Sequence, residues 1–262
     1  MVTKRLFERY LRGRWHRGKL GAVRWLLRTF AFESVRSHHG PILCCNPNDF
    51  TSALAVSGAY GRRLSDHIKH MQHDAMFVDI GASYGLFTIL ASQRLSHGHV
   101  VAFEPNPDVY SRLIDALRLN HAGNVTAVRS AVGSASGSMK LQYDEAHSGM
   151  ARLIDNGSSC TDGVVEVSVT NLADSDLFDE VRSGNAIHVK IDVEGHELEV
   201  IRTLKRAPWY GGIRSLVVEI DDKYLRVFGS EAGELYRVLQ DDGFAPQIGL
   251  DTKSHYDEVF LR

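Results

Sequence analysis

Short apolar runs alternate with segments of helical periodicity over most of the chain. The runs have the length of buried strands and lie at residues 75–79, 99–103, 125–129, 187–192 and 215–220. Between them, apolar residues recur three and four positions apart, as in Leu86, Phe87, Ile89 and Leu90. A second helix is expected after the capping segment 105–107. This alternation predicts an α/β protein with a mostly parallel, doubly wound sheet.

The alternation of strand and helix patterns is interrupted between residues 134 and 185. Residues 138–143 and 164–170 alternate like antiparallel strands, and a polar loop containing His147, Ser148, Gly149 and Arg152 joins them. We interpret this stretch as a β-rich insertion that shapes a substrate site above the strand ends. Near the C-terminus, 231–241 reads as a helix, and 247–249 and 256–261 as an antiparallel pair of strands at the sheet edge.

The first 60 residues have a different character. Residues 4–30 carry an apolar helical face that glycines divide into two short helices; a strand at 41–45 and a helix at 53–71 follow. Residues 1–30 hold nine Lys or Arg and one acid, a net charge of +8, whereas the remaining 232 residues carry 21 basic and 31 acidic residues, a net charge of −10. One interpretation is an arm that contacts a membrane surface or a polyanion, and the other is a helix pair that packs on the core.

Composition narrows the class of protein. No apolar run approaches the roughly 20 residues that span a bilayer, and no secretory signal is visible. Three cysteines, two of them adjacent, form neither a disulfide framework nor a zinc motif, which favours a cytoplasmic protein, with the basic arm allowing peripheral membrane contact. No nucleic-acid-binding module accompanies the basic segment, and no oligomeric state is indicated.

The segment after the first core strand carries the first candidate chemistry. It has the pattern D-x-G-x-x-x-G, with Asp79, Gly81 and Gly85 at the fixed positions and Ser83 where a dinucleotide fingerprint requires glycine. The missing glycine argues against a pyrophosphate and for S-adenosylmethionine (SAM), whose ammonium Asp79 would receive. An NAD-dependent oxidoreductase is the alternative.

Acidic residues also follow the other strands. Glu104 ends the second strand, where a carboxylate commonly holds ribose hydroxyls, and Ser130 and Ala131 end the third, near the expected adenine. Asp192 ends the fourth strand and is the first candidate for a base or acceptor-positioning group; His196 is the second. Asp192 and Glu219 are also candidate Mg²⁺ ligands, although a metal is not favoured.

Three segments together give a family resemblance. The chain resembles the FkbM family of SAM-dependent methyltransferases in FVDIGASYGLFT, VVAFEPNP and HVKIDVEGHELEVI, and more weakly in SGMARL. The likeness runs from about residue 75 to the C-terminus and implies a class I methyltransferase fold with a seven-stranded sheet.

The resemblance also implies an activity and a set of binding residues. Family members methylate hydroxyls of sugars, glycolipid or oligosaccharide units, and polyketides. The implied site residues are Asp79, Gly81, Ala82, Ser83, Tyr84 and Gly85 for the methionine part of SAM, and Glu104, Pro105 and Asn106 for the ribose. We therefore expect a methyltransferase domain at 61–262 and a basic, mostly helical extension at 1–60. A non-catalytic SAM-binding protein is a further alternative.

Overall fold

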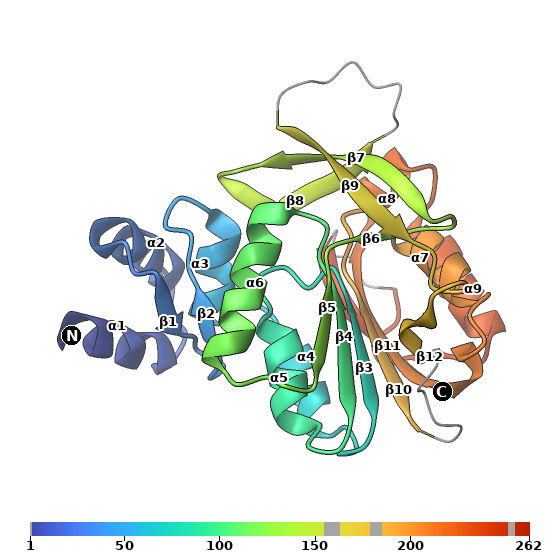
Figure 1. Cartoon of the computed structure of the whole chain (residues 1–262), viewed down its shortest axis with the longest axis horizontal. Helices are drawn as coiled ribbons and strands as arrows, with labels where there is room; N and C mark the ends of the chain where they lie inside the picture. Colours follow the sequence, from blue (N-terminus) through green and yellow to red (C-terminus); the bar gives the residue numbers. More distant parts are fainter. Residues whose placement is uncertain (1, 155–162, 179–184, 251–254) are drawn as a thin grey trace.

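A seven-stranded sheet forms the centre of the computed structural model, which describes residues 2–154, 163–178, 185–250 and 255–262 (Figure 1). From one edge to the other, its strands are β12 (Ala245–Pro246), β13 (His255–Leu261), β11 (Ile213–Asp221), β10 (Ile187–Ile191), β3 (Met76–Ile80), β4 (His99–Phe103) and β5 (Val125–Val128). The five strands from β11 to β5 pair in parallel, and β13 runs antiparallel to both of its neighbours. The predicted class I methyltransferase sheet is confirmed.

The mostly apolar side chains of β3 and β10 explain why these strands lie in the middle of the sheet. Every residue of β3 and β10 is buried, which suits strands that are covered on both faces. The sheet changes direction of winding between these two strands, because β4 and β5 lie on one side of them and β11 on the other. In open α/β sheets, the carboxyl ends at such a switch point bind ligands.

Helices cover both faces of the sheet (Figure 1). Side chains of α4, α5 and α6 pack with Phe77 and Ala102 on one face, and those of α7, α8 and α9 pack with Val78 and Val101 on the other. The helices are α4 (Arg62–Lys69), α5 (Leu86–Arg94), α6 (Pro107–Leu119), α7 (Glu197–Leu204), α8 (Asp222–Val227) and α9 (Ala232–Asp241), with 3-10 turns at Asp176–Phe178 and Tyr210–Gly212. The expected start of α6 is confirmed, since Asn106 caps it by accepting from the N–H groups of Asp108 and Val109.

A smaller sheet lies over the strand ends of the large one (Figure 1). Its strands, in spatial order, are β6 (Ala131–Val132), β9 (Val164–Thr170), β7 (Gly137–Asp144) and β8 (His147–Ile154). The prediction of a polar loop around His147–Arg152 was wrong, because this segment is strand β8. It pairs with β7 and buries Leu153 beside Leu141, which offsets its polar composition.

The N-terminal 60 residues contain three helices, α1 (Val2–Arg12), α2 (Lys19–Phe30) and α3 (Phe50–Ser57). They also contain a two-stranded antiparallel sheet of β1 (Ser34–Arg36) and β2 (Ile42–Cys44). The two expected helices in the basic segment are confirmed. The buried Lys19 of α2 caps the C-terminus of α1, because its Nζ donates to the carbonyl oxygens of Leu11 at 2.6 Å and Gly13 at 2.8 Å. Within the described ranges, no helix has both the length and the apolar character needed to cross a membrane.

Two element boundaries differ from the prediction. The single helix expected at 53–71 is α3 followed by α4, because Gly58 and Gly61 adopt positive φ angles of 75° and 80° and break the helix. At the C-terminus, β12 lies at Ala245–Pro246 and not at 247–249, and β13 lies between β12 and β11, so that only β12 forms the edge.

A histidine pair between α4 and the sheet, of which His188 is buried, predicts acid sensitivity. His67 Nε2 and His188 Nδ1 lie 2.8 and 2.7 Å from the hydroxyl of Ser215. Burial lowers the pKa of His188 to about 4, below the ordinary value of about 6.5. The unfolded chain therefore takes up this proton at a higher pH than the folded chain, and we expect stability to fall as the pH drops from 6.5 to 4.

The measurement is urea unfolding across this pH range. The loss attributable to His188 should be on the order of 3 kcal/mol. His188→Asn should have a flatter pH profile than the wild type, whereas the exposed control His97→Asn should keep the wild-type slope. Parallel profiles for wild type and His188→Asn would contradict this account.

Candidate active site

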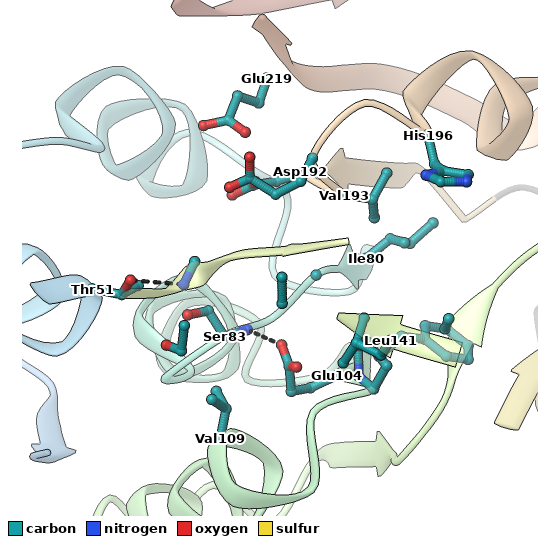
Figure 2. Close-up of a pocket in the computed structure, with 18 of the residues that line it drawn as sticks. Thr51, Ile80, Ser83, Glu104, Val109, Leu141, Asp192, Val193, His196 and Glu219 are labelled. Carbon is teal, nitrogen blue, oxygen red and sulfur yellow. Dashed lines mark hydrogen bonds between the residues drawn. The ribbon is translucent and has the colours of Figure 1, made fainter. Parts of the chain in front are cut away.

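A cavity of about 350 Å³ opens at the carboxyl ends of β3, β4, β10 and β11 (Figure 2). Loops from both halves of the large sheet meet here, and the small sheet contributes to the wall. The structure brings many of the predicted site residues into this wall: Gly81, Ser83, Glu104, Pro105, Ser130, Ala131, Asp192, His196 and Glu219.

The glycine loop brings the chain segments after β3 and β10 into contact. Gly81 has a φ of 81°, and a Cβ at this position would overlap the carbonyl oxygen of Asp192. Gly85 also has a φ of 81°, and a Cβ there would press on the side chain of Leu113 in α6. Only glycine satisfies both the backbone conformation and the close approach at these two positions.

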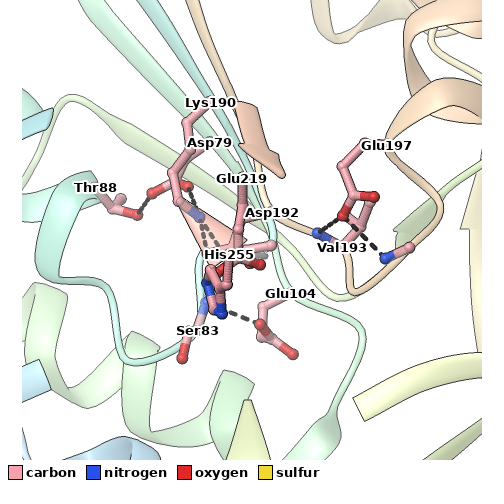
Figure 3. Close-up of polar contacts among 12 residues, drawn as sticks. Asp79, Ser83, Thr88, Glu104, Lys190, Asp192, Val193, Glu197, Glu219 and His255 are labelled. Atoms are coloured by element: carbon pink, nitrogen blue, oxygen red, sulfur yellow. Dashed lines mark hydrogen bonds and ion pairs between the residues drawn. The ribbon is translucent and has the colours of Figure 1, made fainter. Parts of the chain in front are cut away.

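Glu104 anchors the glycine loop to the end of β4. Its Oε2 accepts from the N–H of Ser83 at 2.8 Å (Figures 2 and 3). Its Oε1 accepts from the N–H of Asn106, also at 2.8 Å. Burial raises the pKa of Glu104 to about 7, while these two N–H groups oppose the rise. Each carboxylate oxygen keeps a second lone pair, so the group can also accept hydrogen bonds from a ligand in the cavity.

Asp79 lies beneath the loop and not in the cavity wall. Its carboxylate is fully buried, accepts from the hydroxyl of Thr88 at 2.6 Å, and lies 3.3 Å from Nζ of Lys190 (Figure 3). A protein ammonium therefore already faces the carboxylate that was expected to receive the ligand ammonium, and the binding role of Asp79 stays a prediction.

Four other predicted binding residues also lie outside the cavity wall: Ala82, Tyr84, Gly85 and Asn106. Tyr84 is buried behind the loop, where its hydroxyl donates to Asp49 Oδ2 at 2.6 Å. Asn106 is used as the cap of α6. These residues shape the loop and its support, and their contact with a ligand stays a prediction.

Lys190 joins the two strand-end aspartates. Its Nζ lies 3.2 Å from Asp192 Oδ2 and donates to the carbonyl oxygen of Gly81 at 2.7 Å, in addition to its contact with Asp79 (Figure 3). Burial acts against the charge, yet the two aspartates together raise the pKa of Lys190. Burial likewise acts to raise the pKa of Asp192, but Lys190 keeps it below its ordinary value.

Glu219 completes a carboxyl pair with Asp192. Burial and the neighbouring Asp192 charge raise the pKa of Glu219 well above its ordinary range, which favours the protonated form of Glu219 in its hydrogen bond with Asp192. On its other side, Glu219 Oε1 lies 2.7 Å from Nε2 of His255. Burial and Asp192 also raise the pKa of Glu194, to about 9.

The carboxyl group of Glu194 comes close to this pair. Oxygens of Asp192, Glu194 and Glu219 lie within 4.8 Å of one another, and such oxygens are the ligands that Mg²⁺ prefers. The Lys190 ammonium and the hydrogen bond between Glu219 and Asp192 already offset part of the negative charge of these carboxyl groups.

His196 lies elsewhere in the wall. It precedes α7, and its ring centroid lies 3.9 Å from that of Phe228. In Figure 2 it is separated from Asp192 and Glu219, with Val193 between them. The two candidate bases therefore lie apart in the cavity wall.

Sequence reasoning expected the insertion that contains β8 to shape the site but missed the contribution of the N-terminal segment. Thr51, Leu54 and Tyr60 line the cavity, as do residues 147–149 of β8. Asp49 connects these parts: Oδ1 accepts from the N–H groups of Thr51 and Ser148, and Oδ2 accepts from the hydroxyls of Tyr84 and Ser148. An N-cap residue before an apolar run is a readable signal in the sequence, but its meeting with two distant segments is not.

Comparisons with known proteins agree with this geometry. Residues 79–246 match the methyltransferase FkbM domain. The hexuronic acid methyltransferase AglP of Haloferax volcanii is 27% identical over 194 residues, which cover 74% of this chain and 72% of that protein. The methyltransferase sdnD of Sordaria araneosa is 28% identical over 197 residues, covering 64% and 76%.

Among solved structures, a precorrin-6y C5,15-methyltransferase from Geobacter metallireducens aligns with a TM-score of 0.44 at 15% identity, over 77% of this chain and 86% of the other. The assignment rests on the sequence match, which spans the glycine loop, the β4 acid and the Asp192 segment. The chain belongs to the FkbM family of methyltransferases.

Proposed function

We propose that this protein transfers a methyl group from SAM to a hydroxyl of a sugar, glycolipid or oligosaccharide, or polyketide-type acceptor. The observation that carries the proposal is the arrangement of two carboxyl sites in one cavity. Glu104 lies beside the glycine loop, and the Asp192–Glu219 pair lies in the same wall at the carboxyl ends of β10 and β11. The name of one relative, a hexuronic acid methyltransferase, supports a sugar acceptor.

The cofactor end of the cavity fits SAM. Glu104 would accept from the ribose hydroxyls through its remaining lone pairs, and each such charged hydrogen bond is worth about 1.5–3 kcal/mol. Ser130 and Ala131 would line the adenine side. Because Asp79 is engaged with Lys190, the methionine ammonium would face backbone carbonyl groups of the glycine loop.

The acceptor end supplies a proton acceptor. SAM, when bound, supplies an electrophilic methyl group. Asp192 would orient the acceptor hydroxyl and take its proton, while Lys190 keeps Asp192 ionised and Glu219 fixes its orientation. A weakly basic carboxylate suffices, since the acceptor oxygen becomes strongly acidic as its bond to the methyl carbon forms. Alignment of the two reactants provides the rest of the acceleration.

A divalent cation is the alternative use of the same acids. Asp192, Glu194 and Glu219 offer three carboxylate groups that could hold Mg²⁺ and orient an acceptor with two neighbouring hydroxyls. Methyl transfer that continues in excess chelator would remove this alternative, and activity restored only by added Mg²⁺ would establish it.

Titration calorimetry of the purified protein with SAM, with its demethylated product and with NAD tests the cofactor. We expect SAM and its product to bind and NAD not to bind. Glu104→Ala should weaken SAM binding about 30- to 1000-fold, because it removes the ribose contacts and releases the glycine loop.

Matched controls separate these causes. Glu104→Gln keeps the size of the side chain and should lose less affinity than Glu104→Ala. The exposed Asp115→Ala should bind SAM like the wild type. Binding of NAD without SAM would replace the proposal by an oxidoreductase, and SAM binding without transfer to any acceptor would favour a non-catalytic binding protein.

A further inference from the structure

The outward surface of α1 is a row of arginines. Phe7 and Leu11 bury one face of this helix, and Arg5, Arg9 and Arg12 occupy the opposite face at helical spacing, all exposed. In the described part of the chain, none of these three arginines forms an ion pair. The helix therefore presents an uncompensated positive strip to its surroundings.

Large apolar side chains are exposed in the same region. We call residues 2–30 the N-terminal arm; it comprises α1, α2 and the loop between them. Leu6, Trp15, Trp25 and Phe30 are 61%, 49%, 63% and 45% exposed, and they make up four of the ten large apolar side chains exposed in the described ranges. The arm is only about a tenth of the chain, so this is a local concentration.

Other side chains of the arm pack it against the rest of the protein. Phe7 and Leu11 of α1 and Val23 and Leu27 of α2 are buried in the core that also contains α5 and α6. Trp25 lies on the side of α2 opposite Val23 and Leu27, next to the exposed Arg28. Trp15 lies with its ring 6.0 Å from Nζ of Lys19, but packing of the arm does not account for the exposed Trp25 or for the three arginines.

The combination of tryptophan and arginine indicates a particular partner. An anionic bilayer surface attracts basic side chains and accommodates exposed tryptophan at its headgroup level. The arm has a net charge of +8, whereas the rest of the chain has a net charge of −10 and would be repelled, so the attraction also sets an orientation. A nucleic acid would use the charge but leave Leu6 and Phe30 unexplained.

We propose that the N-terminal arm is a membrane-docking surface that binds anionic lipid bilayers without spanning them. Arg5, Arg9 and Arg12 supply the electrostatic attraction, and Trp15 and Trp25 enter the headgroup region. The arm lies at one end of the molecule, on the opposite side from the C-terminal strands (Figure 1). Docking through it leaves the large sheet and its cavity in the aqueous phase.

Vesicle flotation with the full chain tests the proposal. The probes are vesicles of phosphatidylcholine alone and of phosphatidylcholine and phosphatidylglycerol in equal parts. We expect binding to the anionic vesicles only, weakened by salt. The triple variant R5Q/R9Q/R12Q should bind about a hundredfold more weakly, and Trp25→Ala about tenfold more weakly.

Controls keep a negative result interpretable. The exposed Arg226→Gln on α8 and Leu119→Ala on α6 should float like the wild type. All variants should retain the wild-type circular dichroism spectrum, which excludes unfolding as the cause of lost binding. Equal flotation of the triple variant and the wild type, or no binding to anionic vesicles at low salt, would overturn the proposal. Tight binding to RNA together with absent vesicle binding would assign the arm to nucleic acid instead.

Discussion

Asp192→Asn is expected to lower the kcat for methyl transfer by about 10²–10⁴-fold, the usual contribution of a positioned base. Asparagine keeps the shape of the side chain but removes both the proton acceptor and the charge that faces Lys190. SAM affinity should change far less than kcat. The measurement is steady-state turnover with an acceptor that the wild type methylates, together with calorimetric titration of SAM.

A second variant separates the two candidate bases. His196→Asn should retain most of the turnover, because His196 packs on Phe228 and lies apart from the Asp192–Glu219 pair. Unchanged turnover in Asp192→Asn would remove both a base role and a metal-ligand role for Asp192. A large loss in His196→Asn alone would transfer the base role to the histidine.

Lys190→Met is expected to lower the free energy of unfolding by about 3–5 kcal/mol, the usual cost of breaking a buried ion pair from one side. The substitution leaves the fully buried Asp79 carboxylate without its counter-ion and Asp192 without the ammonium that stabilises its charge. Urea denaturation at neutral pH measures the effect.

The control is a lysine whose partner is closer to solvent. Lys205 lies 2.9 Å from Asp242 in a partly exposed pair, and Lys205→Met should cost no more than about 1 kcal/mol. Equal losses in the two variants would contradict the view that Lys190 stabilises the centre of the sheet. Lys190→Met combined with Asp79→Asn should recover part of the stability, because no buried charge at position 79 then lacks a partner.

The core strands and their order along the chain could be predicted because burial on both faces leaves a strong signal. β3 and β10 are apolar apart from Asp79, His188 and Lys190, and the acids at their ends mark the carboxyl edge. That edge, the glycine turn and Glu104 follow from local sequence. The part of the cavity wall that these residues form was therefore largely predictable.

The function of Asp79 could not be predicted from its position alone. A carboxylate at a strand end looks the same in sequence whether it faces a ligand or a neighbouring strand. Its partner Lys190 is 111 positions away and meets it only because β3 and β10 pair in register, with Asp79 opposite Lys190. The same limit applies to Asp49, whose partners Tyr84 and Ser148 are brought near by the fold.

The Asp49 junction has a consequence for the motions of the molecule. Its hydrogen bonds join residues 35 and 99 positions apart, yet they hold only α3, the glycine loop and β8 together, and no strand of the large sheet depends on them. The Asp49 carboxylate is only 2% exposed, and all four of its hydrogen bonds lie inside this junction. We therefore expect these three segments to move together, as one cooperative unit of the cavity wall.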